Sequence, residues 1–226
     1  MVNTLAFDVY GTLIDTNGVV EKLTRHVGNL SVDFSNTWRN KQLEYSFRRG
    51  LMKNYVKFSV CTQQALDYTC EYFDVDLSPK QKEDLLKQYN DLPAFSDVIE
   101  ALTSLRASGH NMYAFSNGDP VSVDAVLTSA GLRDYFDGII SVDDLKSFKP
   151  NPDVYHYFLE KSGADISHSW LISGNPFDII GALNTGIKAA WLRRSKNMIF
   201  DPWDYKPTVT IQTLPEFSGY LDESLR

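Results

Sequence analysis

The sequence predicts an α/β protein, built on a parallel β-sheet flanked by helices, with a block of helices inserted after the first strand. Helical patterns alternate with short, continuous apolar runs, which are typical of parallel strands buried on both faces. Residues 16–94 interrupt this alternation with helical patterns and no clear strand. The apolar runs span residues 5–7, 112–115, 139–142, 170–172, 189–192 and 209–211. Together these features indicate a Rossmann-like core.

The first expected strand ends at Asp8, and the helical block begins soon after it. Its helical patterns cover residues 19–30, 34–50, 55–73 and 79–90. We therefore expect two domains, a core of residues 1–15 and 95–226 and an all-helical insertion of residues 16–94.

Helices in the remaining chain carry clear end signals. The helices after the second and third strands each begin with a polar N-cap residue followed by proline, and each ends at a glycine. These signals are Asp119-Pro120 with Gly131, and Asn151-Pro152 with Gly163. Another helix is expected to begin at Ser96, and a short one over residues 177–186 follows the fourth strand.

Composition and charge argue against several classes of function. The chain has 226 residues and a net charge of −7, so neither nucleic acid nor an anionic membrane is expected as its main partner. No apolar run approaches the ~18 residues of a membrane span. The N-terminus lacks signal-peptide features, so we expect a cytoplasmic location. Cys61 and Cys70 have neither disulfide nor zinc spacing and are expected to be structural.

Polar side chains follow four of the expected strands, at the point where each strand ends. In open parallel sheets, ligands bind at the carboxyl ends of the strands, so these side chains are the candidates for a site. They are Asp8, Ser116, Asn117, Lys149, Ser173, Asn175 and Asp178.

Each of these residues alone also has an ordinary structural interpretation. Asp8 can be a nucleophile that forms a covalent ester, or it can only hydrogen-bond the turn behind it. Lys149 precedes a helix N-terminus, which indicates either a nearby anion or an ammonium that extends into solvent. Asp178 can orient Lys149 or activate a water, or it can simply favour a helix dipole. Arg39, in the helical insertion, is by itself typical of a solvated arginine.

Together the four segments resemble the haloacid dehalogenase superfamily, in order and over nearly the whole chain. The matching motifs are Asp8-x-Tyr10-Gly11-Thr12, Ser116-Asn117, Lys149-Pro150 and Ser173-x-Asn175-x-x-Asp178. The magnesium-dependent phosphatases of that superfamily carry a second Asp where this chain has Tyr10. They usually carry two acidic residues in the last motif, where this chain has only Asp178. At both of these motifs, and over residues 38–45, the chain is instead similar to the L-2-haloacid dehalogenase branch of the superfamily. That branch needs no metal.

This resemblance implies hydrolysis of L-2-haloalkanoic acids, such as 2-chloropropionate, to D-2-hydroxy acids and halide. A halide leaves without a proton, so the reaction does not need the acid that Tyr10 replaces. The implied route is an ester on Asp8 with inversion at the substrate carbon. The resemblance also implies no cofactor, a small anionic halogenated carboxylic acid as partner, and a homodimer.

The resemblance further implies a role for each site residue. Arg39, Asn117 and Phe177 would receive the halide, while Ser116 and Lys149 would hold the substrate carboxylate. Tyr10, Asn40, Leu43 and Phe58 would surround the alkyl group. Thr12 and Ser173 would support the carboxylate and the lysine, Asn175 and Asp178 would position and activate the water, and Tyr155 matches a polar position near the site.

Two other functions stay open at this point. One is a magnesium-dependent phosphomonoesterase that uses Asp8 as the phosphoryl acceptor. The other is a binding module that kept the fold without catalysis. Which of Asp178 and Lys149 activates the water also stays open.

Overall fold

A computed structural model describes residues 2–224 and contains a six-stranded parallel sheet in the order β3-β2-β1-β4-β5-β6. Every neighbouring pair of strands in it is parallel, so all carboxyl ends lie at one edge. This confirms the predicted fold class. The strands are β1 (Thr4–Phe7), β2 (Asn111–Ser116), β3 (Gly138–Ser141), β4 (Ser169–Ser173), β5 (Lys188–Leu192) and β6 (Val209–Ile211).

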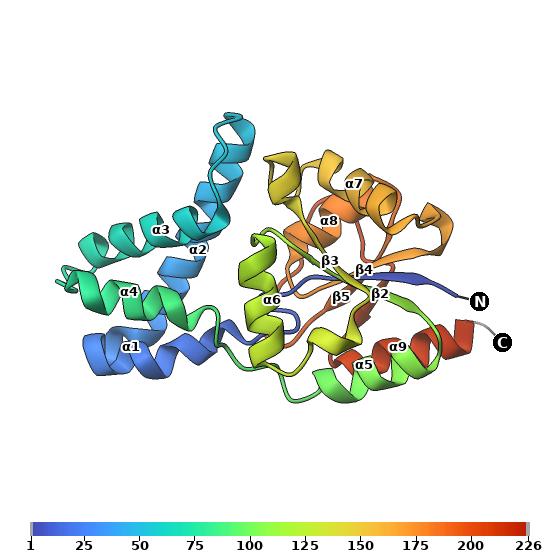
Figure 1. Ribbon diagram of the computed structural model, residues 1–226, viewed down its shortest axis with the longest axis horizontal. Coiled ribbons are helices and arrows are strands. Elements are labelled where there is room, and N and C mark those ends of the chain that lie inside the picture. Colours follow the sequence, from blue (N-terminus) through green and yellow to red (C-terminus); the bar gives the residue numbers. More distant parts are fainter. Residues whose placement is uncertain (1, 225–226) are drawn as a thin grey trace.

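Helices cover both faces of the sheet, because alternate residues of each strand point to opposite sides. Leu5 and Phe7 of β1 belong to a buried cluster with α5, α6 and α9, whereas Ala6 belongs to another cluster with α7 and α8. The result is a three-layer core (Figure 1). The helices are α5 (Val98–Ala107), α6 (Pro120–Ser129), α7 (Pro152–Ser162), α8 (Pro176–Asn184) and α9 (Leu214–Ser224).

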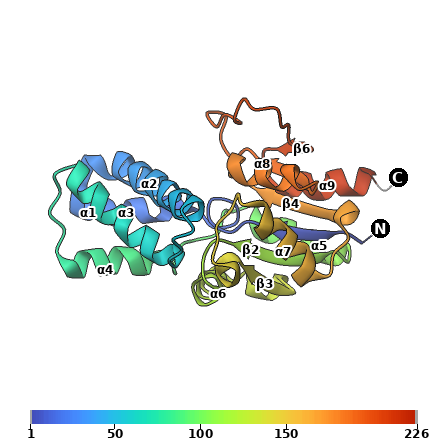
Figure 2. The ribbon, with the colours of Figure 1, turned by 90° about the horizontal axis from the view of Figure 1, so that it is seen from above.

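Four helices form a separate group beside the sheet, at the edge toward which the carboxyl end of β1 points (Figures 1 and 2). They are α1 (Val20–Val27), α2 (Ser31–Leu51), α3 (Phe58–Tyr72) and α4 (Pro79–Gln88). Buried Phe34 and Trp38 of α2 pack among apolar residues of α3 and α4. Both chain ends lie on the opposite side of the molecule, away from this group (Figure 1).

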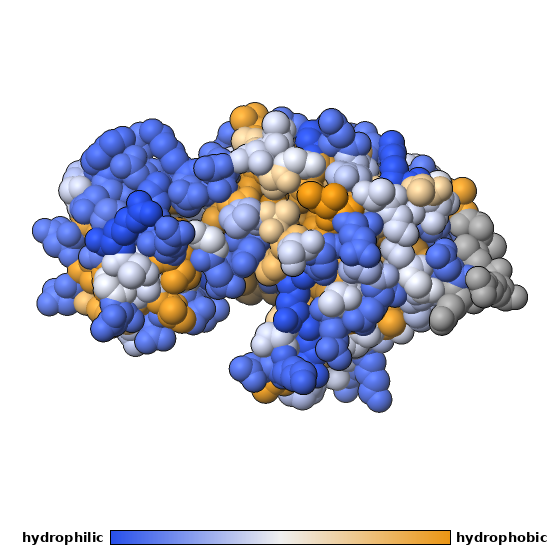
Figure 3. Space-filling view, turned by 90° about the horizontal axis from the view of Figure 1, so that it is seen from below, coloured by the Kyte–Doolittle hydropathy of each residue, from blue (hydrophilic) through white to orange (hydrophobic). Residues whose placement is uncertain are grey.

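Aromatic contacts join the helical group to the core. Phe47 of α2 meets Phe177 of α8 edge-on at 5.0 Å between ring centroids. Tyr55 stacks on Phe148 at 5.0 Å, and its hydroxyl donates a hydrogen bond to Asp143. On one face of the molecule the surface is notched between the two parts (Figure 3).

The sequence also leads us to expect two structural cysteines and no membrane-spanning segment. Cys61 and Cys70 are both buried free thiols, and burial raises the pKa of each. Across residues 2–224, no helix has both the length and the apolar character to cross a membrane.

Candidate active site

Asp8 lies directly after β1, at the centre of the carboxyl edge of the sheet. Its carboxylate receives three side-chain hydrogen bonds. Thr12 Oγ1 and Asn175 Nδ2 donate to Oδ2 at 2.7 and 2.8 Å, and Lys149 Nζ donates to Oδ1 at 3.2 Å. The sharp turn after Asp8 uses Gly11, whose φ of +83° is easily adopted only by glycine. The donors orient a carboxylate that still lines a small chamber.

Lys149 is the cation of this site, and its side chain is only 1% exposed. Besides Asp8, its ammonium donates to Asp178 Oδ2 and to the carbonyl oxygen of Phe115, each at 2.8 Å. An ammonium has three protons, so all of its donors are engaged. The carbonyl of Phe115 is a partner that no sequence motif indicated.

The two carboxylates hold Lys149 in its charged form. Burial alone would lower its pKa, but Asp178 and Asp8 outweigh burial and raise it. Burial raises the pKa of Asp178, and the nearby ammonium opposes that rise. The buried pair is therefore stable only while both partners are present.

Tyr155 and Asp178 stand behind Lys149 rather than in the chamber. Tyr155, which is 1% exposed, donates from its hydroxyl to Asp178 Oδ1 at 2.8 Å. Both oxygens of Asp178 are thus occupied, and Asp178 is absent from the chamber lining among the described residues. Asp178 consequently reaches the chamber through Lys149.

Arg39 enters from helix α2 and lies over the loop that follows Asp8. Its Nη2 donates to the carbonyl oxygen of Tyr10 at 3.4 Å, and its Nη1 donates to Gln42 Oε1 at 2.8 Å. Gln42 is 1% exposed and in turn donates to the hydroxyl of Thr62 on α3. A hydrogen-bond chain from α3 therefore sets the direction of the Arg39 guanidinium.

The chamber beside Asp8 has a volume of about 20 Å³, room for one water by the usual standard. Helices α2 and α3 close it from one side and the strand ends from the other. Ten residues line it, namely Asp8, Tyr10, Arg39, Leu43, Phe58, Ser116, Asn117, Lys149, Asn175 and Phe177.

Comparison with known proteins now decides the family. A model described as "Hydrolase: haloacid dehalogenase-like hydrolase" matches residues 2–186. The chain belongs to the haloacid dehalogenase-like hydrolases. Two relatives of this hydrolase are named (S)-2-haloacid dehalogenase. That of Pseudomonas sp. (strain YL) is 36% identical over 94% of this chain and 91% of its own. The enzyme of Pseudomonas fluorescens is 35% identical over 97% of this chain and 96% of its own length.

A solved structure also resembles this haloacid dehalogenase-like hydrolase. It is the L-2-haloacid dehalogenase from Xanthobacter autotrophicus with chloropropionic acid covalently bound. The TM-score is 0.93 at 29% identity, with 98% of this chain and 99% of the other covered. Membership in a hydrolase family favours an enzyme over the binding module considered above.

The geometry of this haloacid dehalogenase-like hydrolase sorts the predicted residues into two groups. All ten residues of the chamber lining were predicted from the sequence. Thr12, Ser173, Tyr155 and Asp178 lie behind them. Thr12 bonds Asp8, and the Ser173 hydroxyl accepts from the backbone N–H of Asn175 at 3.1 Å. Ser173 thus supports Asn175, and it has no hydrogen bond to Lys149 among the described residues.

Asn40 is the exception, because the structure does not bring it to the chamber. Its side chain is exposed and is absent from the chamber lining of the described residues. Successive helical residues differ by about 100°, so the neighbour of Arg39 points elsewhere, while residues three and four positions on share its face. Gln42 and Leu43 occupy those positions, and this spacing could have identified Gln42.

The donor set of this hydrolase does not fit a magnesium ion. Mg²⁺ needs oxygen ligands around one point, but the Lys149 ammonium already lies between the carboxylates of Asp8 and Asp178 and contacts both. Tyr10 stands where the phosphatase motif carries a second Asp, and the last motif contains one acid, Asp178, where the phosphatases usually carry two. Among residues 2–224, no group of three or more His, Cys, Asp or Glu side chains could hold a metal ion.

Replacing Gly181 with Ala should disturb the site of this hydrolase from behind. A Cβ there would lie 2.3 Å from the Tyr155 hydroxyl, so Tyr155 must move off Asp178. We expect kcat to fall about tenfold and the free energy of unfolding to fall by about 1–3 kcal/mol. Halide release and urea denaturation measure both effects.

Gly219→Ala is the matched control, because Gly219 lies in helix α9 and a Cβ added there would have no heavy atom within 4 Å outside the neighbouring helix backbone. It should keep full activity and gain up to about 1 kcal/mol. Equal activity in the Gly181→Ala variant and the wild-type enzyme would contradict the positioning of Asp178 by Tyr155.

Proposed function

We propose that this enzyme hydrolyses (S)-2-haloalkanoic acids to 2-hydroxy acids and halide through an ester on Asp8. The observation that carries the proposal is the surroundings of Asp8. Its carboxylate accepts hydrogen bonds from Thr12, Asn175 and Lys149, and Tyr10 rather than a second acid lies beside it. The site thus offers a nucleophile and a cation, but no second carboxylic acid beside Asp8 to protonate a leaving group in the first step, which suits a leaving group that needs no proton.

In the first step, a carboxylate oxygen of Asp8 attacks the carbon that bears the halogen. The new C–O bond forms as the carbon–halogen bond breaks, and the bonding pair leaves with the halide. Attack from the back inverts the carbon. Arg39, the amide of Asn117 and the ring edge of Phe177 line the chamber where they can stabilise the departing anion.

The substrate carboxylate needs donors that are still free. Lys149 has none to spare, so it contributes its charge rather than a hydrogen bond. Ser116 accepts from the backbone N–H of Gly118 at 3.0 Å, which leaves its own hydroxyl proton available. We therefore assign the direct hydrogen bond to Ser116, a revision of the role expected for Lys149.

In the second step, water attacks the carbonyl carbon of the Asp8 ester and releases the 2-hydroxy acid. A proton must leave that water. Lys149 can pass one of its own protons to Asp178 at 2.8 Å as it accepts the proton of the water. When the ester C–O bond breaks, the same path runs backwards and delivers that proton to the alkoxide oxygen of the departing 2-hydroxy acid, so Lys149 and Asp178 regain their initial charges. Burial raises the pKa of Asp178, which favours its acceptance of a proton. Both residues then act together.

Halide release in the presence of EDTA tests the proposed function. We expect turnover of (S)-2-chloropropionate and not of its mirror image. The carboxylate, the alkyl group and the halogen have separate places in the proposed site, and only one enantiomer fills all three with its carbon–halogen bond directed away from Asp8. Single turnover in H₂¹⁸O should place label in the Asp8 carboxylate. Release of phosphate from a monoester that depends on Mg²⁺, without turnover of the (S)-haloacid, would establish the phosphomonoesterase instead.

Replacing Gln42 with Met should weaken the halide site without touching the substrate. Arg39 loses its acceptor at 2.8 Å and with it a fixed direction. We expect kcat for (S)-2-chloropropionate to fall about tenfold. The fall should be smaller for the bromo acid, because bromide leaves more easily. Steady-state kinetics on both acids measure this difference.

Gln64→Met is the control, since exposed Gln64 accepts from Arg49 at 2.9 Å away from the chamber. It should leave both rates unchanged. An equal loss for the chloro and bromo acids in Gln42→Met would speak against a role at the leaving group.

We further propose that residues 16–94 act as a cap domain over the core, that two copies form a homodimer, and that the protein is cytoplasmic. Residues of α2 and α3 line one side of the chamber, which supports the cap. Residues 16–94 also carry exposed apolar side chains, including Val32 and Leu51. Burial of these side chains against a second copy would support the homodimer. Light scattering and cell fractionation test the last two proposals.

A further inference from the structure

A second cavity adjoins the chamber. Its volume is about 210 Å³, and it lies between helices α2, α3 and α4 and the start of α6. Tyr10 and Phe58 line both spaces, so their rings form the partition between them. These two side chains belong to the proposed surroundings of the substrate alkyl group. A longer alkyl chain would therefore extend past them into the larger cavity.

Buried polar groups with unused hydrogen-bonding capacity line this cavity. Tyr10 and Tyr89 are 8% and 9% exposed, with ring centroids 6.3 Å apart. Neither hydroxyl has a hydrogen-bond partner among residues 2–224. The rings are buried, but neither hydroxyl oxygen is among the fully enclosed unpartnered atoms of the described residues, so both hydroxyls keep accessible surface and are suited to meet a ligand. Burial raises the pKa of Tyr89 to about 12, which keeps that hydroxyl protonated.

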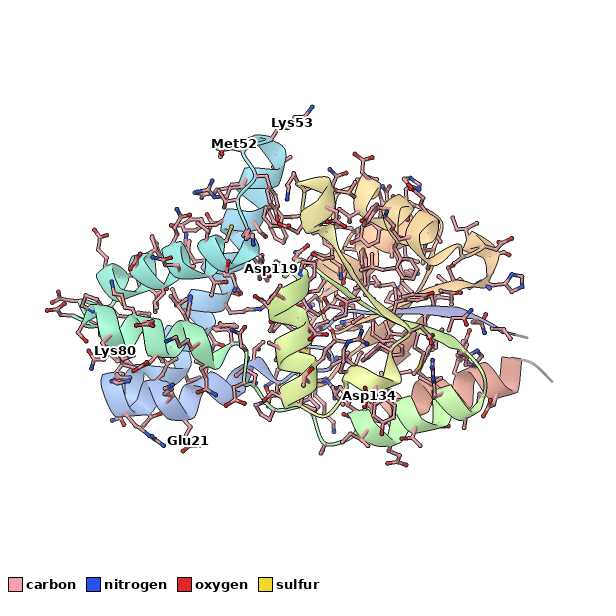
Figure 4. All side chains as sticks on the ribbon, viewed as in Figure 1. Glu21, Met52, Lys53, Lys80, Asp119 and Asp134 are labelled. Atoms are coloured by element: carbon pink, nitrogen blue, oxygen red, sulfur yellow. The ribbon has the colours of Figure 1, made fainter. Side chains whose placement is uncertain are left out.

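Asp119 adds an acceptor at the same cavity. It is 8% exposed and caps α6, where Ser122 donates to its carboxylate from the backbone N–H at 3.3 Å and from Oγ at 2.9 Å. Within the described residues it has no lysine or arginine as an ion-pair partner. Its place at the start of α6, facing the helical group, can be followed in Figure 4. Buried carboxylates are usually paired, so an incoming donor would be favoured here.

The backbone beside Asp119 leaves room for such a group. Gly118 also lines the cavity, and a Cβ there would lie 3.0 Å from Val123 and 3.6 Å from the Tyr10 ring. The contact with Val123 would be tight, whereas that with Tyr10 would be an ordinary van der Waals contact. Glycine at position 118 thus avoids crowding Val123 beside the cavity.

We propose that this cavity is a subsite for the far end of 2-haloacids longer than 2-chloropropionate, selective for a tail that ends in a hydrogen-bond donor. The inference rests on the proposed function. A hydroxyl or a protonated amine would donate to Asp119, with the two tyrosine hydroxyls as further partners. A second carboxylate would be repelled by the charge of Asp119.

Four substrates of equal chain length test the subsite. They are (S)-2-chlorohexanoate and its analogues with a hydroxyl, an ammonium or a carboxylate at carbon 6, with (S)-2-chloropropionate as the reference. For the wild-type enzyme we expect kcat/KM to be about tenfold higher for the two donor tails than for the methyl tail. The carboxylate tail should give the lowest value.

Two variants assign the effect to named groups. Asp119→Asn keeps a good N-cap for α6 and removes the charge. It should lower kcat/KM for the ammonium tail about tenfold, raise it for the carboxylate tail, and leave (S)-2-chloropropionate unchanged. Tyr89→Phe keeps the ring contact with Trp38 at 5.1 Å between centroids. It should lower kcat/KM only for the substrate with the hydroxyl tail. Asp134→Asn, at an exposed position remote from the cavity (Figure 4), is the control for charge.

Equal kcat/KM for all four tails in the wild-type enzyme would overturn the subsite while the proposed function stands. An equal loss on every substrate in Asp119→Asn, (S)-2-chloropropionate included, would do the same, because it would show a general structural effect. No halide release from any haloacid, (S)-2-chloropropionate included, would overturn the proposed function and the subsite together.

Discussion

Replacing Asp8 with Asn should reduce halide release from (S)-2-chloropropionate by about 10⁴-fold or more. An amide oxygen is a far weaker nucleophile than a carboxylate, and no other carboxylate lines the chamber among the described residues. The loss should appear in kcat rather than in substrate affinity, because Ser116 and Arg39 are unchanged. A chloride-release assay under saturating substrate measures it.

The design of that experiment must exclude reversion of the amide to the acid. Intact mass spectrometry detects such hydrolysis directly, and Asp8→Ala avoids it. Asp134→Asn, at an exposed surface position, controls for loss of one negative charge. If both Asp8 variants kept more than about a hundredth of the activity, a covalent ester on Asp8 would be ruled out.

Replacing Lys149 with Met should be the most damaging change to stability. It leaves Asp8 and Asp178 without their cation, and Asp178 is fully buried. Breaking a buried pair in this way costs about 3–5 kcal/mol, and activity should be lost as well. Urea denaturation gives the free energy of unfolding, and circular dichroism shows whether the variant folds.

The loss of stability in Lys149→Met should depend on pH in a definite direction. Burial raises the pKa of Asp178 in the folded protein, and without the ammonium only the hydrogen bond from Tyr155 opposes that rise. The folded state then binds a proton more readily than the unfolded state. The destabilisation is therefore fullest above the raised pKa and shrinks as pH falls through it toward the ordinary pKa of an aspartate.

A double variant separates charge from packing. Lys149→Met combined with Asp178→Asn removes the fully buried charge of Asp178, leaving Asp8 as the remaining unpaired carboxylate, and should recover a large part of the stability at neutral pH, without activity. The same stability in the single and double variants, at every pH, would contradict the account of Lys149 and Asp178 as a coupled pair.

The fold class could be predicted because strands and helices have different sequence patterns, continuous apolar runs for the strands and helical periodicity with end signals for the helices. Runs such as residues 112–115 and 170–172 are continuously apolar and became the β2 and β4 strands on either side of β1. The chamber residues that follow the strands could be predicted from the strand ends, since parallel strands bring Asp8, Ser116 and Asn175 to one edge. Local spacing and topology were sufficient for that part. The chamber residues of the helical insertion, Arg39, Leu43 and Phe58, were expected only from the family resemblance.

Other contacts depend on three-dimensional packing that spacing does not encode. Asn40 follows Arg39 in the sequence but points away, whereas Gln42 shares the face of Arg39 and bonds it. The Phe115 carbonyl that receives Lys149 belongs to the backbone and has no side-chain signature. The larger cavity is formed by α3, α4 and the start of α6, which are distant in sequence.

The central place of β1 affects how the enzyme becomes active during synthesis. The chain emerges from the ribosome with Asp8 first, but β1 lies between β2 and β4, and its partners Lys149, Asn175 and Thr12 come from segments up to residue 175. Domains fold as units from contacts of this range. A nascent chain that has not passed β4 therefore carries Asp8 without Asn175 and without one of the two strands beside β1. Asp8 can acquire its full set of hydrogen-bond donors only after residue 175 has been added.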